Sequence, residues 1–269
     1  MAATLPAAAN QPTGAASVQL QNVSRVYARS GHSDLLAVEG ATLEIVPGEF
    51  CSILGPSGCG KTTLLMLMAG LYGPSSGRVL VNGRPVVGPY TSVGMVFQND
   101  VLLDWRTVLD NVLLPVEVKR LRRSTYEEKA RSLLELVGLC DFAGAYPEQL
   151  SGGMRQRVAI CRALVFDPPL LLMDEPFAAL DAMTREKLNL DLMQLTAESR
   201  STVAFVTHSI DEAVLMSDRI FIMAPRPGRV LRTIEVGIGR PRTLATRSHP
   251  RFHQLVSEIR DVFHSMGII

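Results

Sequence analysis

The sequence predicts an α/β fold with a parallel sheet at its core. Apolar runs such as PLLLMDEP, STVAFVTHS and RIFIMAP alternate with amphipathic segments around MTREKLNLDLMQLTAES and IDEAVLMSD in the second half of the chain. Alternation of strands and helices is typical of βαβ units. Strands that are apolar on both faces indicate a sheet that helices cover on both sides.

The first 100 residues are rich in predicted strands. Runs of β-branched and apolar residues, separated by turn residues at Pro47-Gly48 and Asn82-Gly83, are typical of short strands. These runs are VQLQNVSRVY, ATLEIV, EFCSIL, RVLVNGRPV and SVGMVFQ. We therefore expect the early part of the chain to be β-rich.

The middle of the chain is predicted to be helical. Apolar residues recur three and four positions apart in TVLDNVLLPVEVKRL and TYEEKARSLLELVGL, which is the pattern of amphipathic helices. Residues 141–149 are expected to form a loop. A serine N-cap in SGGMRQRVAICRALVFD and Pro168-Pro169 beyond its end predict a further helix.

The two ends of the chain are expected to be short appendages. Residues 1–17 are rich in Ala, Pro and Gly and predict a disordered tail and no secretory signal. Residues 225–269 hold eight Arg against three acidic residues and predict a packed amphipathic helix with a solvated basic side. The apolar face of that helix would comprise Phe252, Leu255, Val256, Ile259, Val262 and Phe263.

Composition limits the possible function classes. The 269 residues carry a net charge of +1, which gives no broad basic surface for DNA or RNA, so we expect no nucleic-acid partner. Mean hydropathy is +0.18, yet no stretch approaches the roughly 18 consecutive apolar residues of a membrane span. Either a large core or an apolar surface covered by a partner explains this. The four cysteines lack CxxC spacing and indicate reduced thiols.

A phosphate-binding loop is predicted at GPSGCGKT. The motif GxxxxGK[ST] directly follows the strand FCSIL and precedes an apolar helix, which is the context that such a loop requires. Its backbone N–H groups can wrap a phosphate chain at the positive end of that helix. Lys61 would bind the β- and γ-phosphates, and Thr62 would bind Mg²⁺. The predicted nucleotide-binding residues here are Gly55, Pro56, Ser57, Gly58, Cys59, Gly60, Lys61, Thr62 and Thr63.

Cys59 in this loop has two interpretations. It is either a tolerated small residue or a reactive thiol whose pKa is lowered by the helix N-terminus beside it.

LLLMDEP predicts the second half of a nucleotide site. Side chains alternate along a strand, so Asp174 and Glu175 cannot share one role. Asp174 suits the Mg²⁺ shell, and Glu175 suits polarising the attacking water. In LSGGM, Ser151 precedes two glycines at a predicted helix N-terminus, which is a second anion-binding arrangement.

The segment LSGGMRQRVAICRAL resembles the signature of the ATP-binding cassette (ABC) ATPases, usually LSGGQ. The other cassette motifs follow in the family's order. The resemblance implies a P-loop NTPase of ABC type at residues 18–224, with a parallel-sheet core, an N-terminal antiparallel β part and an inserted helical subdomain at about 100–165. It further implies that Tyr27 stacks on adenine, Gln98 forms the Q-loop, Asp181 lies in the D-loop, and His208 is the switch histidine.

In this family two cassettes stack head to tail, which implies that a second copy of this chain is a partner. The phosphate loop of one copy and Ser151, Gly152 and Gly153 of the other would hold each ATP. The resemblance implies catalytic roles for Glu175, His208, Lys61 and Gln98, with Mg²⁺ at Thr62, Gln98 and Asp174. Met154 replaces the usual Gln, and we expect activity to be retained because the phosphate contacts come from Ser151 and backbone N–H groups.

Three segments, VLLDWRTVLDNVLLP, LSGGMRQRVAI and APRPGRV, resemble the ATPase subunits of bacterial importers for nitrate, sulfonates and taurine. This implies transport-coupled ATP hydrolysis at the cytoplasmic face of the inner membrane, with transmembrane permease subunits and, indirectly, an external solute-binding protein as partners. The first segment, with Trp105, Leu102 and Leu103, either packs in the core or lines a groove for a permease helix. An ABC ATPase with soluble partners in cofactor assembly remains an alternative.

Overall fold

The computed structural model describes residues 14–29, 31, 33–178 and 180–268. Its core is a six-stranded sheet in the order β10-β9-β3-β8-β7-β6. These strands are β3 (Phe50–Leu54), β6 (Val93–Val96), β7 (Leu170–Asp174), β8 (Thr202–Thr207), β9 (Arg219–Met223) and β10 (Val230–Glu235). All neighbours pair in parallel except β10, which runs antiparallel to β9. The predicted parallel core is confirmed. Strands β3, β7 and β8 are buried along their whole length, as a sheet covered on both faces requires.

A second, antiparallel sheet has the strand order β2-β1-β4-β5. Its strands are β1 (Val18–Tyr27), β2 (Leu35–Ile45), β4 (Ser76–Val81) and β5 (Arg84–Pro85). The predicted hairpin turn is confirmed, since Asn82 and Gly83 have positive φ values of 51° and 71° and Val81 pairs with Arg84. Positive φ at both central residues is the geometry of the two-residue turn that Asn-Gly favours.

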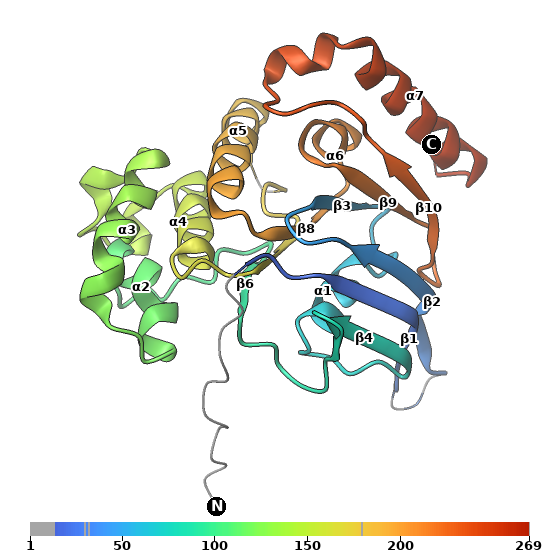
Figure 1. Ribbon diagram of the computed structural model, residues 1–269, viewed down its shortest axis with the longest axis horizontal. Coiled ribbons are helices and arrows are strands. Elements are labelled where there is room, and N and C mark those ends of the chain that lie inside the picture. The colour runs from blue at the N-terminus through green and yellow to red at the C-terminus, as the bar shows by residue number, and fades with distance from the viewer. Residues whose placement is uncertain (1–13, 30, 32, 179, 269) are drawn as a thin grey trace, which may run out of the picture.

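Helices cover both faces of the parallel sheet (Figure 1). They are α1 (Lys61–Met68), α5 (Ala182–Ser199), α6 (Ile210–Met216) and α7 (Pro250–Ser265), with a 3₁₀ turn η3 (Leu244–Ser248) before α7. Helix α1 packs between the two sheets, in one apolar cluster, while α5, α6 and α7 belong to a second cluster on the opposite face. Each face of the sheet therefore has its own core.

Three helices form a group beside the sheets, at the left of Figure 1. They are α2 (Val108–Val118), α3 (Arg123–Leu136) and α4 (Gly152–Leu164), within the range predicted to form a helical subdomain. The loop expected at 141–149 is wrong in detail. Two 3₁₀ turns, η1 (Cys140–Phe142) and η2 (Pro147–Gln149), occur there. Short turns of this kind carry no apolar periodicity, so the sequence pattern does not reveal them.

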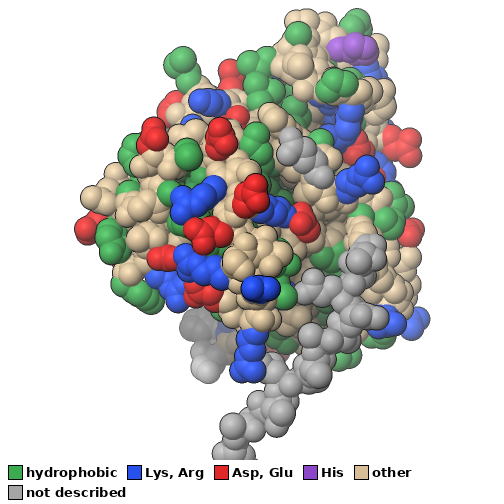
Figure 2. Space-filling view, turned by 60° about the vertical axis from the view of Figure 1, so that its left-hand side comes forward, with side chains coloured by type: hydrophobic (Ala, Val, Ile, Leu, Met, Phe, Trp, Pro, Cys, Tyr) green, Lys and Arg blue, Asp and Glu red, His purple; other side chains and the backbone are tan. Residues whose placement is uncertain are grey.

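Acidic and basic side chains are mixed on the face of the helical group. Figure 2 turns this side forward and shows red and blue side chains next to one another. Arg123 donates to Asp110 at 2.6 Å and to Glu117 at 2.9 Å, and Arg106 donates to Glu117 at 2.7 Å. These opposite charges therefore offset one another locally.

The C-terminal helix α7 is amphipathic as predicted. Five of the six expected apolar residues are buried, and Val262 packs against the core at its edge. Arg242 lies in the same basic segment but before the helix, and it is only 6% exposed. Its guanidinium donates to the carbonyl oxygens of Leu215, Ser217 and Ile238. Burial lowers the pKa of Arg242 to about 10, and the three carbonyls replace the water that burial removes.

The expected tail boundary at residue 17 is also wrong. Residues 1–13 lie outside the described residues, but Ala16 is fully buried. Its N–H donates to the carbonyl of Pro169 at 3.0 Å, and Thr202 Oγ1 donates to its carbonyl at 2.5 Å. The packed chain thus begins before β1. Within the described ranges, no helix has both the length and the apolar character to cross a bilayer.

Candidate functional site

Four predicted motifs follow the carboxyl ends of strands β3, β6, β7 and β8. Because these strands are parallel, their carboxyl ends lie along one edge of the sheet. This is the edge at which open α/β sheets bind ligands. The motif residues there are Gly55–Thr62 after β3, Gln98 after β6, Asp174 and Glu175 at the end of β7, and His208 after β8.

The phosphate loop curls tightly into α1. Gly58 and Gly60 have φ values of 74° and 95°, a left-handed conformation that glycine adopts without strain. A Cβ on Gly60 would lie 2.8 Å from the carbonyl oxygen of Ala37 in β2. Backbone shape therefore favours glycine at both positions, and the close Ala37 carbonyl is a second reason at Gly60.

Lys61 begins α1 and is only 5% exposed. Its Nζ donates to the carbonyls of Gly55 at 2.8 Å and Pro56 at 3.0 Å, and lies 3.4 Å from Glu175 Oε1. The ammonium group thus stands inside the loop, where a phosphate oxygen can exchange for these partners.

The hypothesis of a reactive Cys59 is wrong in its premise. The side chain is 1% exposed, and burial raises the pKa of the Cys59 thiol despite the opposing charge of Lys61. Desolvation of the thiolate outweighs the helix N-terminus. Cys59 is a small buried residue, and its Sγ would lie 2.9 Å from a Cβ placed on Gly55.

Thr62 and Asp174 come together at the loop. Thr62 Oγ1 donates to Asp174 Oδ1 at 3.1 Å, and burial raises the pKa of the Asp174 carboxyl. A hydroxyl and a carboxylate oxygen are hard donors of the kind that Mg²⁺ prefers. The pair fits the predicted metal role. Gln98 lies at the same sheet edge with its side chain exposed, and no hydrogen bond or ion pair joins it to the other described residues.

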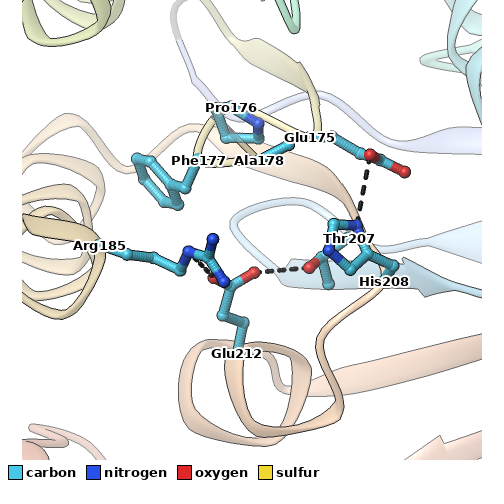
Figure 3. Close-up of a pocket in the computed structure, with 8 residues that line it drawn as sticks. All are labelled: Glu175, Pro176, Phe177, Ala178, Arg185, Thr207, His208 and Glu212. Carbon is cyan, nitrogen blue, oxygen red and sulfur yellow. Dashed lines mark hydrogen bonds and ion pairs between the residues drawn. The ribbon is translucent and has the colours of Figure 1, made fainter. Parts of the chain in front are cut away.

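Glu175 contacts two other predicted catalytic residues. Its Oε2 lies 3.3 Å from His208 Nδ1, shown by a dashed line in Figure 3, and its Oε1 faces Lys61. Glu175 has a φ of 45°, which is costly for a residue with a long side chain and typical of functional sites. The Glu175 side chain is 19% exposed. Because water can reach the carboxylate, it can accept a proton from a water in the site.

A buried carboxylate behind this pair was not predicted. Glu212 accepts a hydrogen bond from Thr207 Oγ1 at 2.5 Å, and Arg185 lies 3.8 Å from its other oxygen (Figure 3). Arg185 in turn donates to the carbonyl of Leu180 at 2.9 Å. The network links the start of α5 to the residue before His208. The S-x-x-E pattern from Ser209 to Glu212 predicts a capping box, but the side chain bonds Thr207.

Tyr27 lies at the end of β1 beside the phosphate loop. Its OH is 3.3 Å from Thr63 Oγ1. The guanidinium carbon of Arg25 lies 4.9 Å from the centre of the Tyr27 ring. The ring of Tyr72 contacts the Tyr27 ring edge-on, with ring centroids 5.9 Å apart. These contacts hold the ring in one orientation, which suits the predicted stacking on adenine.

The remaining predicted residues form a second group. Ser151 caps α4, with Oγ accepting from the N–H of Met154 at 3.3 Å, as its sequence predicts. Asp181 caps α5 by accepting from the N–H groups of Met183 and Thr184. Hydrogen bonding by the Thr184 side chain, and then by these backbone N–H groups, lowers the pKa of Asp181. No hydrogen bond or ion pair among the described residues joins Ser151–Gly153 to the phosphate loop. The site predicted from the sequence is therefore divided within one chain.

The helix that follows Ser151 is bonded to the segment after β6. Arg155 Nε donates to Asp100 Oδ2 at 2.9 Å, and Gln156 Nε2 donates to the carbonyl of Phe97 at 3.3 Å. Arg162 donates to the carbonyls of Asp100 at 2.6 Å and Val101 at 2.7 Å. Side-chain hydrogen bonds therefore join α4 to the segment that follows β6.

A family model described as "ABC transporter" matches residues 38–178. The chain belongs to the ABC transporter family. It is similar to an uncharacterised ABC transporter ATP-binding protein of Methanocaldococcus jannaschii, at 46% identity over 84% of each chain. A taurine import ATP-binding protein of Rhizobium johnstonii is 43% identical over 89% of this chain and 92% of that protein.

Two further comparisons agree with the family. A bicarbonate transport ATP-binding protein of Synechococcus elongatus is 45% identical over 90% of this chain and 37% of its own length. A solved dimeric ATP-binding cassette in a post-hydrolysis state, bound to ADP and Pi, has 36% identity and a TM-score of 0.72, and covers 82% of this chain and 100% of its own. The chain is thus an ATP-binding ABC ATPase, and the predicted ABC-type fold is confirmed.

Proposed function

We propose that this ABC ATPase powers a bacterial importer and couples ATP-driven dimerisation of two cassettes to the uptake of a small solute. Nitrate, a sulfonate, taurine or a related compound is the proposed solute, and relatives named for taurine import and bicarbonate transport support this class. The observation that carries the hydrolytic role is the contact of Glu175 with both Lys61 and His208. Soluble partners in cofactor assembly are not favoured by these relatives.

In the proposed mechanism, the phosphates of ATP lie on the N–H groups of the phosphate loop and on Lys61 Nζ, while adenine stacks on Tyr27. Thr62, Asp174 and Gln98 would hold Mg²⁺, which supplies positive charge to the phosphates when bound. Phosphate binding would draw Lys61 away from Glu175. The Glu175 carboxylate then orients the attacking water and accepts its proton, and His208 donates a hydrogen bond to the γ-phosphate.

A second copy of the chain is the proposed partner that completes the site. Ser151 and Gly152 are exposed, and the N–H groups at the start of α4 suit a γ-phosphate held by the other copy. Asp181 would contact the facing subunit. ATP would bind the closed dimer more tightly than the open one, and hydrolysis would remove that preference. The dimeric state of the similar solved cassette supports this arrangement.

A permease docking surface is proposed around Trp105. Its side chain is 74% exposed and Val101 is 54% exposed, whereas Leu102 is 9% exposed and packs in the core. Buried Asn111 stiffens this loop, because its Nδ2 donates to the carbonyls of Leu103 and Arg106 and its Oδ1 accepts from the Leu103 N–H. A rigid exposed Trp is a typical anchor of an interface. Docking there would place the chain peripherally at the cytoplasmic face of the inner membrane.

The hydrolytic part is tested with Glu175→Gln, which keeps the shape of the side chain and removes the base. We expect ATPase activity to fall at least about 100-fold, while ATP with Mg²⁺ shifts the variant to a dimer in size-exclusion chromatography. Glu258→Gln is the control, because that carboxylate pairs with Arg232 on the surface. Normal turnover in Glu175→Gln would refute the assigned role.

The importer part is tested by expressing the chain in its native host and identifying the transmembrane proteins that co-purify with it. Trp105→Ala should reduce co-purification of the permease and solute uptake by about tenfold or more, with the ATPase activity of the isolated chain unchanged. Val87→Ala, at a side chain that is 97% exposed on the antiparallel part, is the control. Unchanged assembly and uptake in Trp105→Ala would exclude this docking surface.

A further inference from the structure

The turn between β9 and β10 is not used by the nucleotide site described above. It comprises residues 224–230, APRPGRV, and the N–H of Ala224 donates to the carbonyl of Arg229 at 2.9 Å to close it. The turn lies against the outer side of the phosphate loop, although the two segments are more than 160 residues apart in the sequence.

Two residues of this turn contact the phosphate loop. Arg226 Nε donates to the carbonyl oxygen of Gly58 at 3.0 Å, and a Cβ on Gly58 would lie 2.6 Å from the same guanidinium. Gly228 packs on the next peptide, since a Cβ placed on it would lie 1.9 Å from the carbonyl oxygen of Cys59. Successive carbonyls of the loop are therefore covered by the turn.

Backbone bonds to β2 hold the turn itself in place. The N–H of Gly228 donates to the carbonyl of Ala37 at 3.0 Å, and the N–H of Glu39 donates to the carbonyl of Gly228 at 2.9 Å. These two bonds form a short parallel bridge between Val38 and Gly228. The same Ala37 carbonyl closely approaches Gly60. Strand β2, the turn and the phosphate loop thus form one packed unit.

This arrangement bears on phosphate binding through peptide geometry. In a planar trans peptide the C=O and the following N–H point in opposite directions. A bond that holds the Gly58 carbonyl therefore turns the Cys59 N–H to the opposite side, where it donates to the Pro56 carbonyl at 3.4 Å. Lys61 Nζ donates to the same carbonyl, so a phosphate that binds Lys61 can take the place of this partner. A loop that cradles phosphate uses inward N–H groups, and donors that are already oriented cost less entropy on binding.

We propose that Arg226 is a positioning residue for nucleotide binding, which orients the phosphate loop by holding the Gly58 carbonyl and takes no part in the hydrolytic step. Its side chain is exposed and makes no ion pair with the other described residues, so water screens most of the effect of its charge. The hydrogen bond from Arg226 Nε to the Gly58 carbonyl is what orients the phosphate loop. This inference depends on nucleotide binding by the chain and not on the identity of the transported solute.

Three variants of the full chain test the proposal. Arg226→Met keeps the length of the side chain as far as the Nε position and removes the donor. Arg226→Gln restores a donor without the charge, since Gln Nε2 stands as many bonds from Cα as Arg Nε. Arg229→Met is the control in the same turn, because Arg229 pairs with exposed Glu39 at 3.4 Å.

We expect Arg226→Met to weaken binding of ADP with Mg²⁺, and to raise the KM for ATP, by about three- to tenfold, the size of one hydrogen bond. Its kcat at saturating ATP should stay within about twofold. Arg226→Gln should bind ADP with an affinity within about twofold of that of the unaltered chain. The control Arg229→Met should bind ADP as tightly as the unaltered chain does. Titration calorimetry with ADP and steady-state ATPase kinetics provide the measurements.

Three results would overturn the proposal. Unchanged ADP affinity in Arg226→Met would show that the bond does not matter. An equal loss of ADP affinity in Arg226→Met and Arg226→Gln would show that the charge of the guanidinium, and not the hydrogen bond, matters. A fall in kcat with unchanged affinity would place Arg226 in the hydrolytic step. Because ADP binding is measured on the isolated chain, none of these results depends on whether the importer proposal holds.

Discussion

The phosphate loop and the LSGGM segment are both glycine-containing turns at the start of a helix, but the fold surrounds them differently. The phosphate loop has β2 and the β9–β10 turn packed on its outer side, and Lys61 inside it is 5% exposed. Ser151 and Gly152 are exposed, and the bond from Met154 to Ser151 is local. The phosphate loop is therefore supported by β2 and by the β9–β10 turn in addition to its own helix, whereas the bond that Ser151 accepts lies within its own helix.

The difference teaches how two similar local signals acquire different roles. A helix N-terminus attracts anions in either case, but only the first loop has a buried cation and oriented donors within the chain. The second presents its donors to solvent, as one half of a shared site would. The four predictions below test the two loops and the burial of Cys59, beginning with the largest expected effect.

Lys61→Ala should weaken ATP binding about 100-fold, since a buried ammonium that bonds phosphate oxygens contributes more than a neutral donor. Titration with ATP and Mg²⁺ measures the loss. Lys187→Ala, at an exposed position on α5, should change affinity less than twofold. A loss below threefold in Lys61→Ala would mean that this loop is not the phosphate site.

Thiol labelling compares buried and exposed cysteines. Burial raises the pKa of Cys59, Cys51 and Cys161, the last to about 12, whereas Cys140 is exposed. At pH 8 a raised pKa leaves less thiolate, so Cys140 alone should react quickly, at least about tenfold faster than the others. Cys140→Ser should abolish this fast phase in a 5,5′-dithiobis(2-nitrobenzoate) assay. A fast labelling phase that persists in Cys140→Ser and that ATP suppresses would support the hypothesis that the Cys59 thiol is reactive.

Ser151→Ala removes the cap of α4. Such a loss costs about 1 kcal/mol, which corresponds to a fall in Tm of about 3 °C for a chain of this size. Thermal unfolding followed by circular dichroism measures it. ADP affinity should not change, because the phosphate loop is intact, while the ATP-dependent dimer of Glu175→Gln should weaken. Lower ADP affinity would show that the two loops are coupled within one chain.

Met154→Gln should have the smallest effect, with ATPase activity within about twofold. The N–H of Met154, and not its side chain, bonds Ser151, and the half-buried side chain packs at the edge of the core. Steady-state ATPase assays of the two chains provide the comparison. A change of tenfold in either direction would give the side chain a role that the backbone contact does not explain.

Features with a local cause were predictable from the sequence. The Asn82-Gly83 turn, the Ser151 cap and the glycines of the phosphate loop depend on the backbone preferences of a few adjacent residues. The buried strands β7 and β8 were predictable for a related reason, since each contains four consecutive apolar residues, a pattern typical of a buried strand.

Features that depend on distant burial were not predictable. The sequence left two interpretations of Cys59 open, and only its packing decides between them, because burial removes the water that a thiolate needs. Arg242 belonged to a basic segment, yet it is buried against three carbonyls. The bond between Glu212 and Thr207 follows a capping pattern that predicts a different partner.

The sequence by itself determined the α/β class, the phosphate loop and the residue types of an ATPase site, because short motifs carry their own backbone geometry and charge. Only the tertiary structure decided which of those residues meet. It joined Lys61, Glu175 and His208 at one sheet edge, left Ser151 apart from them, and placed Arg226 against Gly58. These contacts join segments separated by 33 to 168 positions, and such pairings depend on packing that no local pattern encodes.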